Sequence, residues 1–155
     1  VIAESRRRFV VVDTAPTGHT LLLLDATGSY HREVARQLGD RHFTTPLMRL
    51  QDPELTKVII VALAETTPVL EAAGLQRELE RAQIHTWAWV INNSLAAAEP
   101  TAPLLRRRAA AEVPQITKVK NDYADRIALV PLLAVEPVGI PALQGLCGAQ
   151  RTSRR

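Results

Sequence analysis

The stretch VVVDTAPTGHTLLLLDATG, residues 10–28, sets a β-branched apolar run directly before an aspartate, a Pro-Thr-Gly turn and a histidine. An apolar run that is continuous, and does not alternate with polar residues, indicates a strand covered on both faces, as in a parallel sheet. Later parts of the chain repeat this character, so the sequence predicts four strands. They are FVVVD (9–13), KVIIVAL (57–63), TWAWVINN (86–93) and RIALVPLL (126–133).

Helical patterns separate these runs, and strands that alternate with helices predict a doubly wound, parallel α/β sheet. We expect the helix that contains Pro114 to break there, because proline lacks the amide hydrogen that a helix interior uses. Residues 40–54 and 96–103 are expected to be irregular connections. The predicted helices are HTLLLLDA (19–26), YHREVARQLGD (30–40), TTPVLEAAGLQRELERAQI (66–84), PLLRRRAAAEVPQITKVKNDYAD (103–125) and residues 141–145.

The composition is that of an ordinary globular domain, with 155 residues of which 46% are hydrophobic and 23% charged. The chain starts without Met and enters a strong strand within a few residues. We therefore expect residues 1–150 to be the carboxyl-terminal portion of one domain, followed by a disordered basic tail at 151–155. No apolar run approaches the ~20 residues of a membrane span. The single cysteine, Cys147, cannot form an internal disulfide.

The net charge of +3 comes largely from arginine clusters, among them residues 6–8 and 106–108. A nucleic-acid-binding domain usually spreads basic residues over one face and adds aromatic side chains on which bases stack. Aromatic residues make up only 4% of this chain. We interpret the arginine runs as solvated helix faces and expect no nucleic-acid partner.

Ligands of a doubly wound sheet bind beyond the carboxyl ends of its strands. Asp13 lies at such an end, where a carboxylate either orients Mg²⁺ through water or caps the next turn. The sequence from Pro16 to Gly18 suits a tight turn that can change shape with the state of a bound nucleotide. His19 follows the turn and either starts a helix with a local hydrogen bond or ligates a metal.

Asn92 and Asn93 end another predicted strand, where their amides either read the edge of a purine or form a turn. Pro131 stiffens the loop after the last strand. The printed sequence contains no GxxxxGK[ST] phosphate loop and no CxxC or HxxxH pair. The residues by themselves leave these alternatives open.

With these motifs, the chain resembles the arsenical pump-driving ATPase family from about Phe9 to Leu146. The resemblance implies the α/β fold of the deviant P-loop NTPases, here incomplete because the amino-terminal strands and the phosphate loop are absent. The form with LLLLDATG looks like the second of the family's two homologous halves. The stretches that match in order are DTAPTGHTLLLLDATGSYHRE, HFTTPLMRLQDPELTKV, ETTPVLEAAGLQRELERA, WVINNSL and LVPLLAVEP.

The resemblance implies ATP and Mg²⁺ as cofactors, with arsenite or antimonite as activator and substrate. It makes Asp13 the Mg²⁺-associated carboxylate, His19 a metalloid ligand and Asn92 a contact of adenine, with Asn93 beside it. The other implied residues are Thr14, Ala15, Pro16, Thr17, Gly18 and Thr20 in the switch segment, and Pro131, Leu132 and Leu133 near the adenine or ribose. The implied partners are a membrane-embedded arsenite efflux pump and the other ATPase half or the missing amino-terminal part, so we expect a cytoplasmic protein, peripheral at the inner membrane.

The printed sequence departs from the family pattern in two respects. It lacks the phosphate loop with its lysine, and it lacks the metalloid-binding cysteines, none of which Cys147 matches. By itself it is therefore expected to be inactive as an ATPase. One alternative is the related ATPase that delivers tail-anchored membrane proteins, which shares DTAPTGHT. That function uses a Met-rich groove and a CxxC motif, whereas this chain has only Met48. The other alternative is an inactive, truncated remnant.

Overall fold

The computed structural model describes residues 9–14, 33, 36 and 45–148. The chain divides into two compact units, which we describe separately. Unit 1 comprises Val1–Ile60 and Leu70–Trp87, and unit 2 comprises Val61–Val69 and Ala88–Arg155. Three predicted features lie outside the described residues. They are the helix predicted at 19–26, the helix predicted at 30–40 except residues 33 and 36, and the tail at 151–155.

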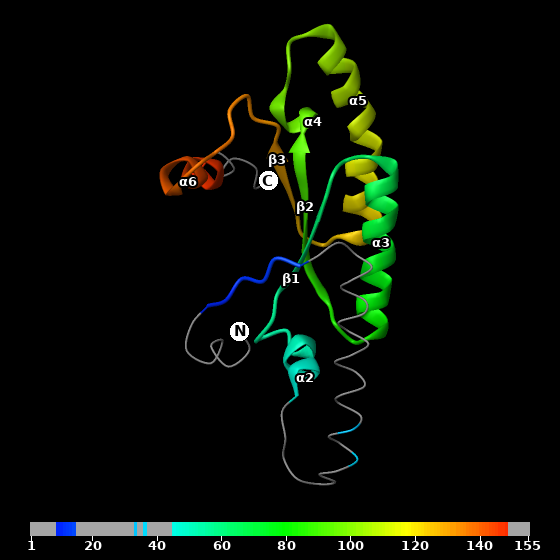
Figure 1. Ribbon diagram of the computed structural model, residues 1–155. Helices are drawn as coiled ribbons and strands as arrows, with labels where there is room; N and C mark the ends of the chain where they lie inside the picture. Colours follow the sequence, from blue (N-terminus) through cyan, green and yellow to red (C-terminus); the bar gives the residue numbers. More distant parts are fainter. Residues whose placement is uncertain (1–8, 15–32, 34–35, 37–44, 149–155) are drawn as a thin grey trace. The chain divides into compact units, whose positions relative to one another are not determined.

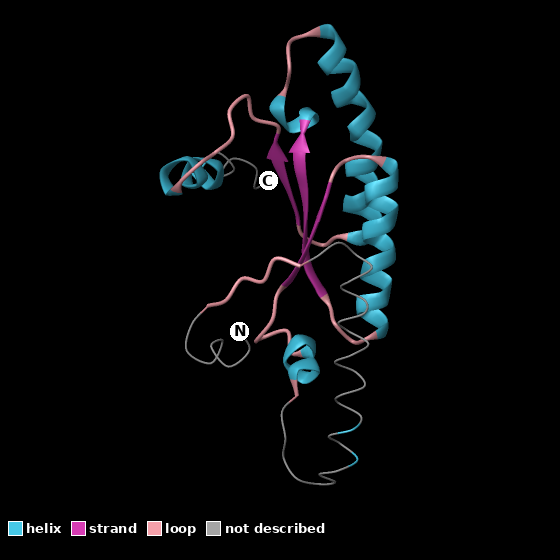
Figure 2. Cartoon of the chain, viewed as in Figure 1, coloured by secondary structure: helices cyan, strands magenta, loops and turns pink. Residues whose placement is uncertain are grey.

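Three strands form one parallel sheet in the order β1-β2-β3 (Figures 1 and 2). β2 and β3 are paired in parallel, with Trp89 opposite Ile127 and Ile91 opposite Leu129. The strands confirm three of the four predicted runs and the α/β class. Their bounds are Val58–Ala62 for β1, Thr86–Ser94 for β2 and Ile127–Pro131 for β3.

Helical segments connect and flank the strands in the alternating order that the sequence predicts. The connection from β1 to β2 is one helix, whereas the connection from β2 to β3 contains three consecutive helical segments. Among the helices that the structure describes, none combines the length and the apolar character needed to cross a bilayer. The bounds are α2 Pro46–Gln51, α3 Thr66–Arg81, α4 Leu95–Ala98, α5 Pro103–Lys118, the π-helical η2 Val119–Tyr123 and α6 Ile140–Gly148.

The strand predicted at residues 9–13 is wrong, because residues 9–14 have no regular secondary structure. A strand exists only when its backbone groups pair with a neighbouring strand, and none of the described strands pairs with this segment. Most of its apolar side chains are accordingly in solvent, with Phe9 94% and Val11 79% exposed. Local composition predicted a buried strand, but the backbone pairing that would make one is not local.

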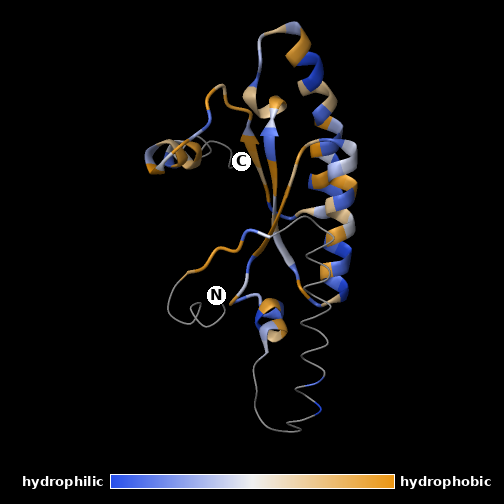
Figure 3. Ribbon diagram, in the orientation of Figure 1, coloured by the Kyte–Doolittle hydropathy of each residue, from blue (hydrophilic) through white to orange (hydrophobic). Residues whose placement is uncertain are grey.

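The expectation that the strands are buried on both faces is wrong for β1. Along β1, the buried residues Ile60 and Ala62 alternate with the exposed residues Ile59 and Val61. Successive side chains of a strand point to opposite faces, so this alternation means that one face is covered and the other is open. The exposed residues Ile59 and Val61 are hydrophobic as well, and Figure 3 shows hydrophobic colour along β1. Burial of both faces requires a second covering layer, which the described residues do not place over Ile59 and Val61.

The break predicted at Pro114 does not occur, since α5 is continuous from Pro103 to Lys118. Proline removes the hydrogen bond from its own nitrogen to the carbonyl four residues earlier, that of Ala110. Both Pro114 and Ala110 are exposed, so water can satisfy that carbonyl. The departure from α-helical geometry comes later, at the π-helical turn η2.

Two segments expected to be irregular contain short helices. Within 40–54, α2 begins at Pro46, and the hydroxyl of the preceding Thr45 accepts a hydrogen bond from the Met48 amide at 3.3 Å. A threonine cap followed by a first-turn proline is a common helix start. Within 96–103, α4 ends at Ala98, and the following residue, Glu99, adopts the left-handed conformation with φ 48°.

In unit 1, α2 is tied to the end of α3 by a hydrogen bond from Gln51 Nε2 to the Ala82 carbonyl at 2.8 Å. The end of α3 is closed by Gln83 at φ 60° and by a bond from the Ile84 amide to the Leu79 carbonyl at 2.8 Å. This left-handed closure satisfies carbonyls that the helix end would otherwise leave unpaired. Leu79 and Ile84 are both buried, so the closure also forms part of the core of unit 1.

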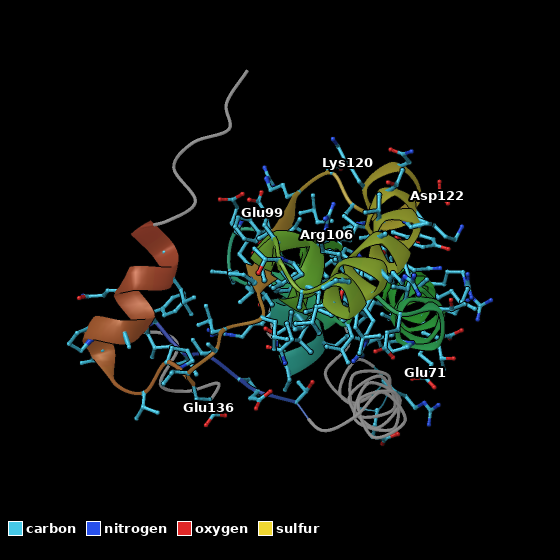
Figure 4. All side chains as sticks on the ribbon, turned by 90° about the horizontal axis from the view of Figure 1, so that it is seen from above. Glu71, Glu99, Arg106, Lys120, Asp122 and Glu136 are labelled. Carbon is cyan, nitrogen blue, oxygen red and sulfur yellow. The ribbon has the colours of Figure 1, made fainter. Side chains whose placement is uncertain are left out.

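In unit 2, the core is built on Trp89, which is 0% exposed and stacks on Tyr123 with ring centroids 5.7 Å apart and planes at 18°. Lys118 Nζ lies 5.2 Å from the centre of the Tyr123 ring and 2.7 Å from Asp122 Oδ2. Figure 4 shows Asp122 at the outer side of η2. The hydrogen bond with Asp122 is the main reason that the pKa of Lys118 is raised above its ordinary value of 10.5, and a hydrogen bond with Tyr123 adds to it.

Asp122→Asn is expected to lower the pKa of Lys118 back toward 10.5. A folded-state pKa above the unfolded value stabilises the fold fully below the unfolded pKa and loses this effect as the pH rises through the folded pKa. The variant should therefore melt at most about 3 °C below the parent at neutral pH, since the pair is partly exposed. The difference should shrink above pH 10.5.

The pKa itself is measured by NMR titration of the Lys118 side chain, with the exposed Asp125→Asn as the matched control. A pKa of Lys118 that is the same in the parent and in Asp122→Asn would contradict the assigned cause.

Candidate functional site

The polar residues at the carboxyl end of β2 occupy a β-bulge. Ile91 pairs with Leu129 and Ser94 with Pro131, so three steps along β2 match two steps along β3. Asn93 takes up the extra residue in the left-handed conformation, with φ 53°. Asparagine tolerates this conformation better than most residues. The bulge therefore explains Asn93 by backbone geometry and leaves its exposed amide and that of the half-buried Asn92 at the strand end.

Ser94, the last residue of β2, is 1% exposed and connects three segments of unit 2. Its Oγ accepts a hydrogen bond from the Ala97 amide at 3.1 Å and so caps the amino terminus of α4. The same hydroxyl donates to Glu112 Oε2 at 2.8 Å. Its carbonyl accepts a hydrogen bond from the Leu132 amide at 3.0 Å.

The side chain of Glu112, on α5, reaches the start of α4 and belongs to a residue that sequence reasoning missed. Its Oε1 accepts a hydrogen bond from the Leu95 amide at 3.1 Å, and its Oε2 accepts one from the Ala96 amide at 3.0 Å. The first amides of a helix have no partner within the helix, and a carboxylate suits this end electrostatically. A local capping box would place Glu or Gln three residues after Ser94, but that residue is Ala97. The distant Glu112 takes the role instead, and no local sequence signal reveals it.

The loop after β3 lies at the same edge of the sheet. Pro131 ends β3 and has no amide hydrogen, so the next residue, Leu132, supplies the bond to Ser94. Leu132 and Leu133 are both exposed. The structure thus brings the predicted residues Asn92, Asn93 and 131–133 together at one edge, as expected for the carboxyl ends of parallel strands.

The segment after β1 is linked to this edge of the sheet by a side chain of α5. Gln115 Nε2 donates to Thr66 Oγ1 at 3.2 Å, at the start of α3. Glu112 and Gln115 are three residues apart and so lie on one face of the helix. α5 therefore contacts the segments that follow β1 and β2 through neighbouring side chains.

The first predicted site lies in unit 1, where Asp13 and Thr14 are both exposed. Ala15, Pro16, Thr17, Gly18, His19 and Thr20 lie outside the described residues. Within the described part of the chain, no three His, Cys, Asp or Glu side chains gather in a way that could hold a metal ion. A single exposed carboxylate is still a suitable partner for Mg²⁺, which keeps several waters and takes much of its coordination from phosphates.

Removing either side chain of the Ser94–Glu112 pair is expected to destabilise unit 2. Glu112→Ala leaves three donors without their acceptor and should lower the free energy of unfolding by about 3 kcal/mol, and Ser94→Ala by about 2 kcal/mol. The double variant should show a coupling of about 1 kcal/mol, since the two side chains are bonded to each other. Urea denaturation followed by circular dichroism measures all three values. The exposed Glu71→Ala should change stability by less than about 0.5 kcal/mol, and equal losses for Glu71 and Glu112 would refute the assignment.

Several known proteins are similar to this chain in sequence. An arsenical pump-driving ATPase of Escherichia coli is 65% identical over 149 residues, which cover 96% of this chain and 26% of that protein. One of Acidiphilium multivorum is 66% identical over 147 residues, 94% of this chain and 25% of that protein. The ATPase GET3A of Arabidopsis thaliana is more distant, at 28% identity over 171 residues, 87% of this chain and 48% of that protein.

The chain thus spans about a quarter of the length of these two bacterial proteins. A family model described as anion-transporting ATPase matches residues 47–149, from α2 to the end of α6. This match covers the sheet and the elements that lie at the carboxyl ends of its strands in unit 2, the region that we call the carboxyl edge. The chain therefore belongs to the anion-transporting ATPase family.

Proposed function

We propose that this chain is part of an ATPase that drives an arsenical efflux pump, and that it supplies the adenine side of a nucleotide site. The observation that carries the proposal is 65% identity over 96% of the chain with an arsenical pump-driving ATPase. Because the chain spans about a quarter of that relative, hydrolysis is a property of a longer protein. The 155-residue chain alone is expected to be inactive, since it contains no phosphate loop.

The bulge at the end of β2 and the loop after β3 are suited to hold an adenine base. The amides of Asn92 and Asn93 offer both donors and acceptors, which the polar edge of a purine requires. Leu132 and Leu133 offer exposed apolar surface beside them, which suits the flat face of the base. Pro131 limits the freedom of this loop. We assign these five residues to adenine or ribose binding.

Asp13 is assigned as the carboxylate associated with Mg²⁺. When bound, the ion supplies charge neutralisation at the phosphates. The part of Asp13 is to orient the hydration shell of the ion, for which an exposed carboxylate at the end of an apolar run is suitable. Residues Thr14, Ala15, Pro16, Thr17, Gly18 and Thr20 are assigned to a switch that senses the nucleotide through Asp13, and His19 to metalloid binding.

Arsenite or antimonite is the proposed activator and cargo, and the proposed partners are a membrane-embedded pump and the other ATPase half. As(III) and Sb(III) prefer thiolates, and the chain offers only Cys147, which is exposed on α6. Metalloid binding by this chain alone should therefore be weak. The proposed location is the cytoplasm, at the inner membrane when the pump is bound.

The alternative of an ATPase that delivers tail-anchored proteins is less well supported by similarity. Identity with the ATPase GET3A is 28%, against 65% with the arsenical pump-driving ATPase. The third possibility, an inactive remnant, is separated from the first by the experiment below.

The test replaces the matching 149 residues of the Escherichia coli arsenical pump-driving ATPase by this chain and measures ATP hydrolysis by the hybrid. We expect hydrolysis that antimonite stimulates. Asp13→Asn in the hybrid should lower kcat by about 100-fold, because it removes a charge that orients the metal.

The control is the exposed Asp125→Asn, which should stay within about twofold of the parent hybrid. A hybrid that folds but does not hydrolyse ATP would support the inactive remnant. Hydrolysis without stimulation would favour the protein-delivery alternative, and an Asp13→Asn hybrid with full activity would refute the magnesium assignment.

A further inference from the structure

We infer that Glu112 is a positioning residue for adenine recognition, which acts through Ser94 on the two segments that hold the base. This inference rests on the proposed function and adds to it a residue on a different helix. Glu112 itself is not placed in contact with the nucleotide.

The first step of the argument is the geometry of the carboxylate. Its two oxygens accept bonds from the Ser94 hydroxyl at 2.8 Å, the Leu95 amide at 3.1 Å and the Ala96 amide at 3.0 Å. These donors belong to three consecutive residues. A carboxylate accepts at both oxygens, so it fixes the direction in which the chain leaves β2. An amide side chain of the same length accepts at one atom only.

The second step leads from Ser94 to both parts of the proposed base site. Asn92 and Asn93 immediately precede Ser94 in the bulge. Leu132, on the other side, donates its amide hydrogen to the Ser94 carbonyl at 3.0 Å. A displacement of Ser94 therefore moves the polar contacts of the base on β2 and the apolar contacts after β3 at the same time.

The third step is that capping of α4 does not by itself require a carboxylate from another helix. Ser94 Oγ already caps α4 by accepting from the Ala97 amide at 3.1 Å. Glu112 adds a restraint from α5, a separate helix, 18 residues along the chain from Ser94. Its neighbour on the same helix face, Gln115, bonds to Thr66. Together, Glu112 and Gln115 couple the positions of the segments that follow β1 and β2 to the position of α5. Small displacements at a binding site have large effects on recognition.

The experiment introduces Glu112→Gln into the hybrid ATPase and compares steady-state hydrolysis of ATP and GTP. The variant should raise KM for ATP about tenfold and leave kcat within about twofold. The ratio of KM for GTP to KM for ATP should fall, because adenine-specific contacts are lost and phosphate contacts are kept. Ser94→Ala is a second variant in case the first folds poorly, and its KM for ATP should rise about threefold.

Asn92→Ala tests the base contact directly and should also raise KM for ATP, and Glu71→Gln on α3 is the matched control that should change neither constant. A purely structural role of Glu112 would reduce the fraction of active enzyme. In that case kcat would fall equally for both nucleotides with KM unchanged, and the inference would be overturned.

The proposed function fails separately. If the hybrid with the unaltered chain does not hydrolyse ATP, the proposed function is overturned, and the inference falls with it. If that hybrid is active but indifferent to both Glu112→Gln and Ser94→Ala, only the inference is overturned.

Discussion

The hydrogen bonds between the Glu112 carboxylate and the start of α4 are the constraint on which the carboxyl edge of unit 2 depends. A helix of four residues cannot be stable by itself, because nucleation costs more than so few internal bonds return. α4 exists because Ser94 and Glu112 satisfy its first amides, and because it contacts both α5 and β3. The direction of the chain beyond β2 is thus determined by a side chain from another helix.

The bulge at Asn93 is a consequence of the same geometry. Ser94 must present its hydroxyl to Glu112 and its carbonyl to Leu132. An unbroken ladder from Ile91 onward would put a different residue opposite Pro131, and one extra residue changes the face to which each following side chain points. The left-handed Asn93 provides that residue at small steric cost. The pair of asparagines therefore has a backbone role as well as the side-chain role that we propose.

Sequence reasoning succeeded where the signal is local. The runs at β1, β2 and β3 were predicted from their β-branched composition, and the edge residues Asn92 and Pro131 were predicted because they lie at the ends of such runs. It failed where the determinant is distant. The run at 9–13 has a strand composition without a described pairing partner, and Glu112 acts on residues that lie 16 to 18 positions earlier. The roles of Asp13 and of the switch residues are still predictions.

The continuity of α5 through Pro114 shows how these distant contacts outweigh a local preference. Glu112, Gln115 and Val119 recur at helical spacing and point to Ser94, to Thr66 and into the core respectively. Pro114 lies off this face, on the exposed side of the helix. A break there would separate Glu112 from Gln115 and uncouple the ends of β1 and β2. Proline costs about 3 kcal/mol in a helix interior, and the three hydrogen bonds of Glu112 together with the burial of Val119 are of the same order. The helix therefore stays continuous because residues on both sides of Pro114 are anchored by contacts with other elements.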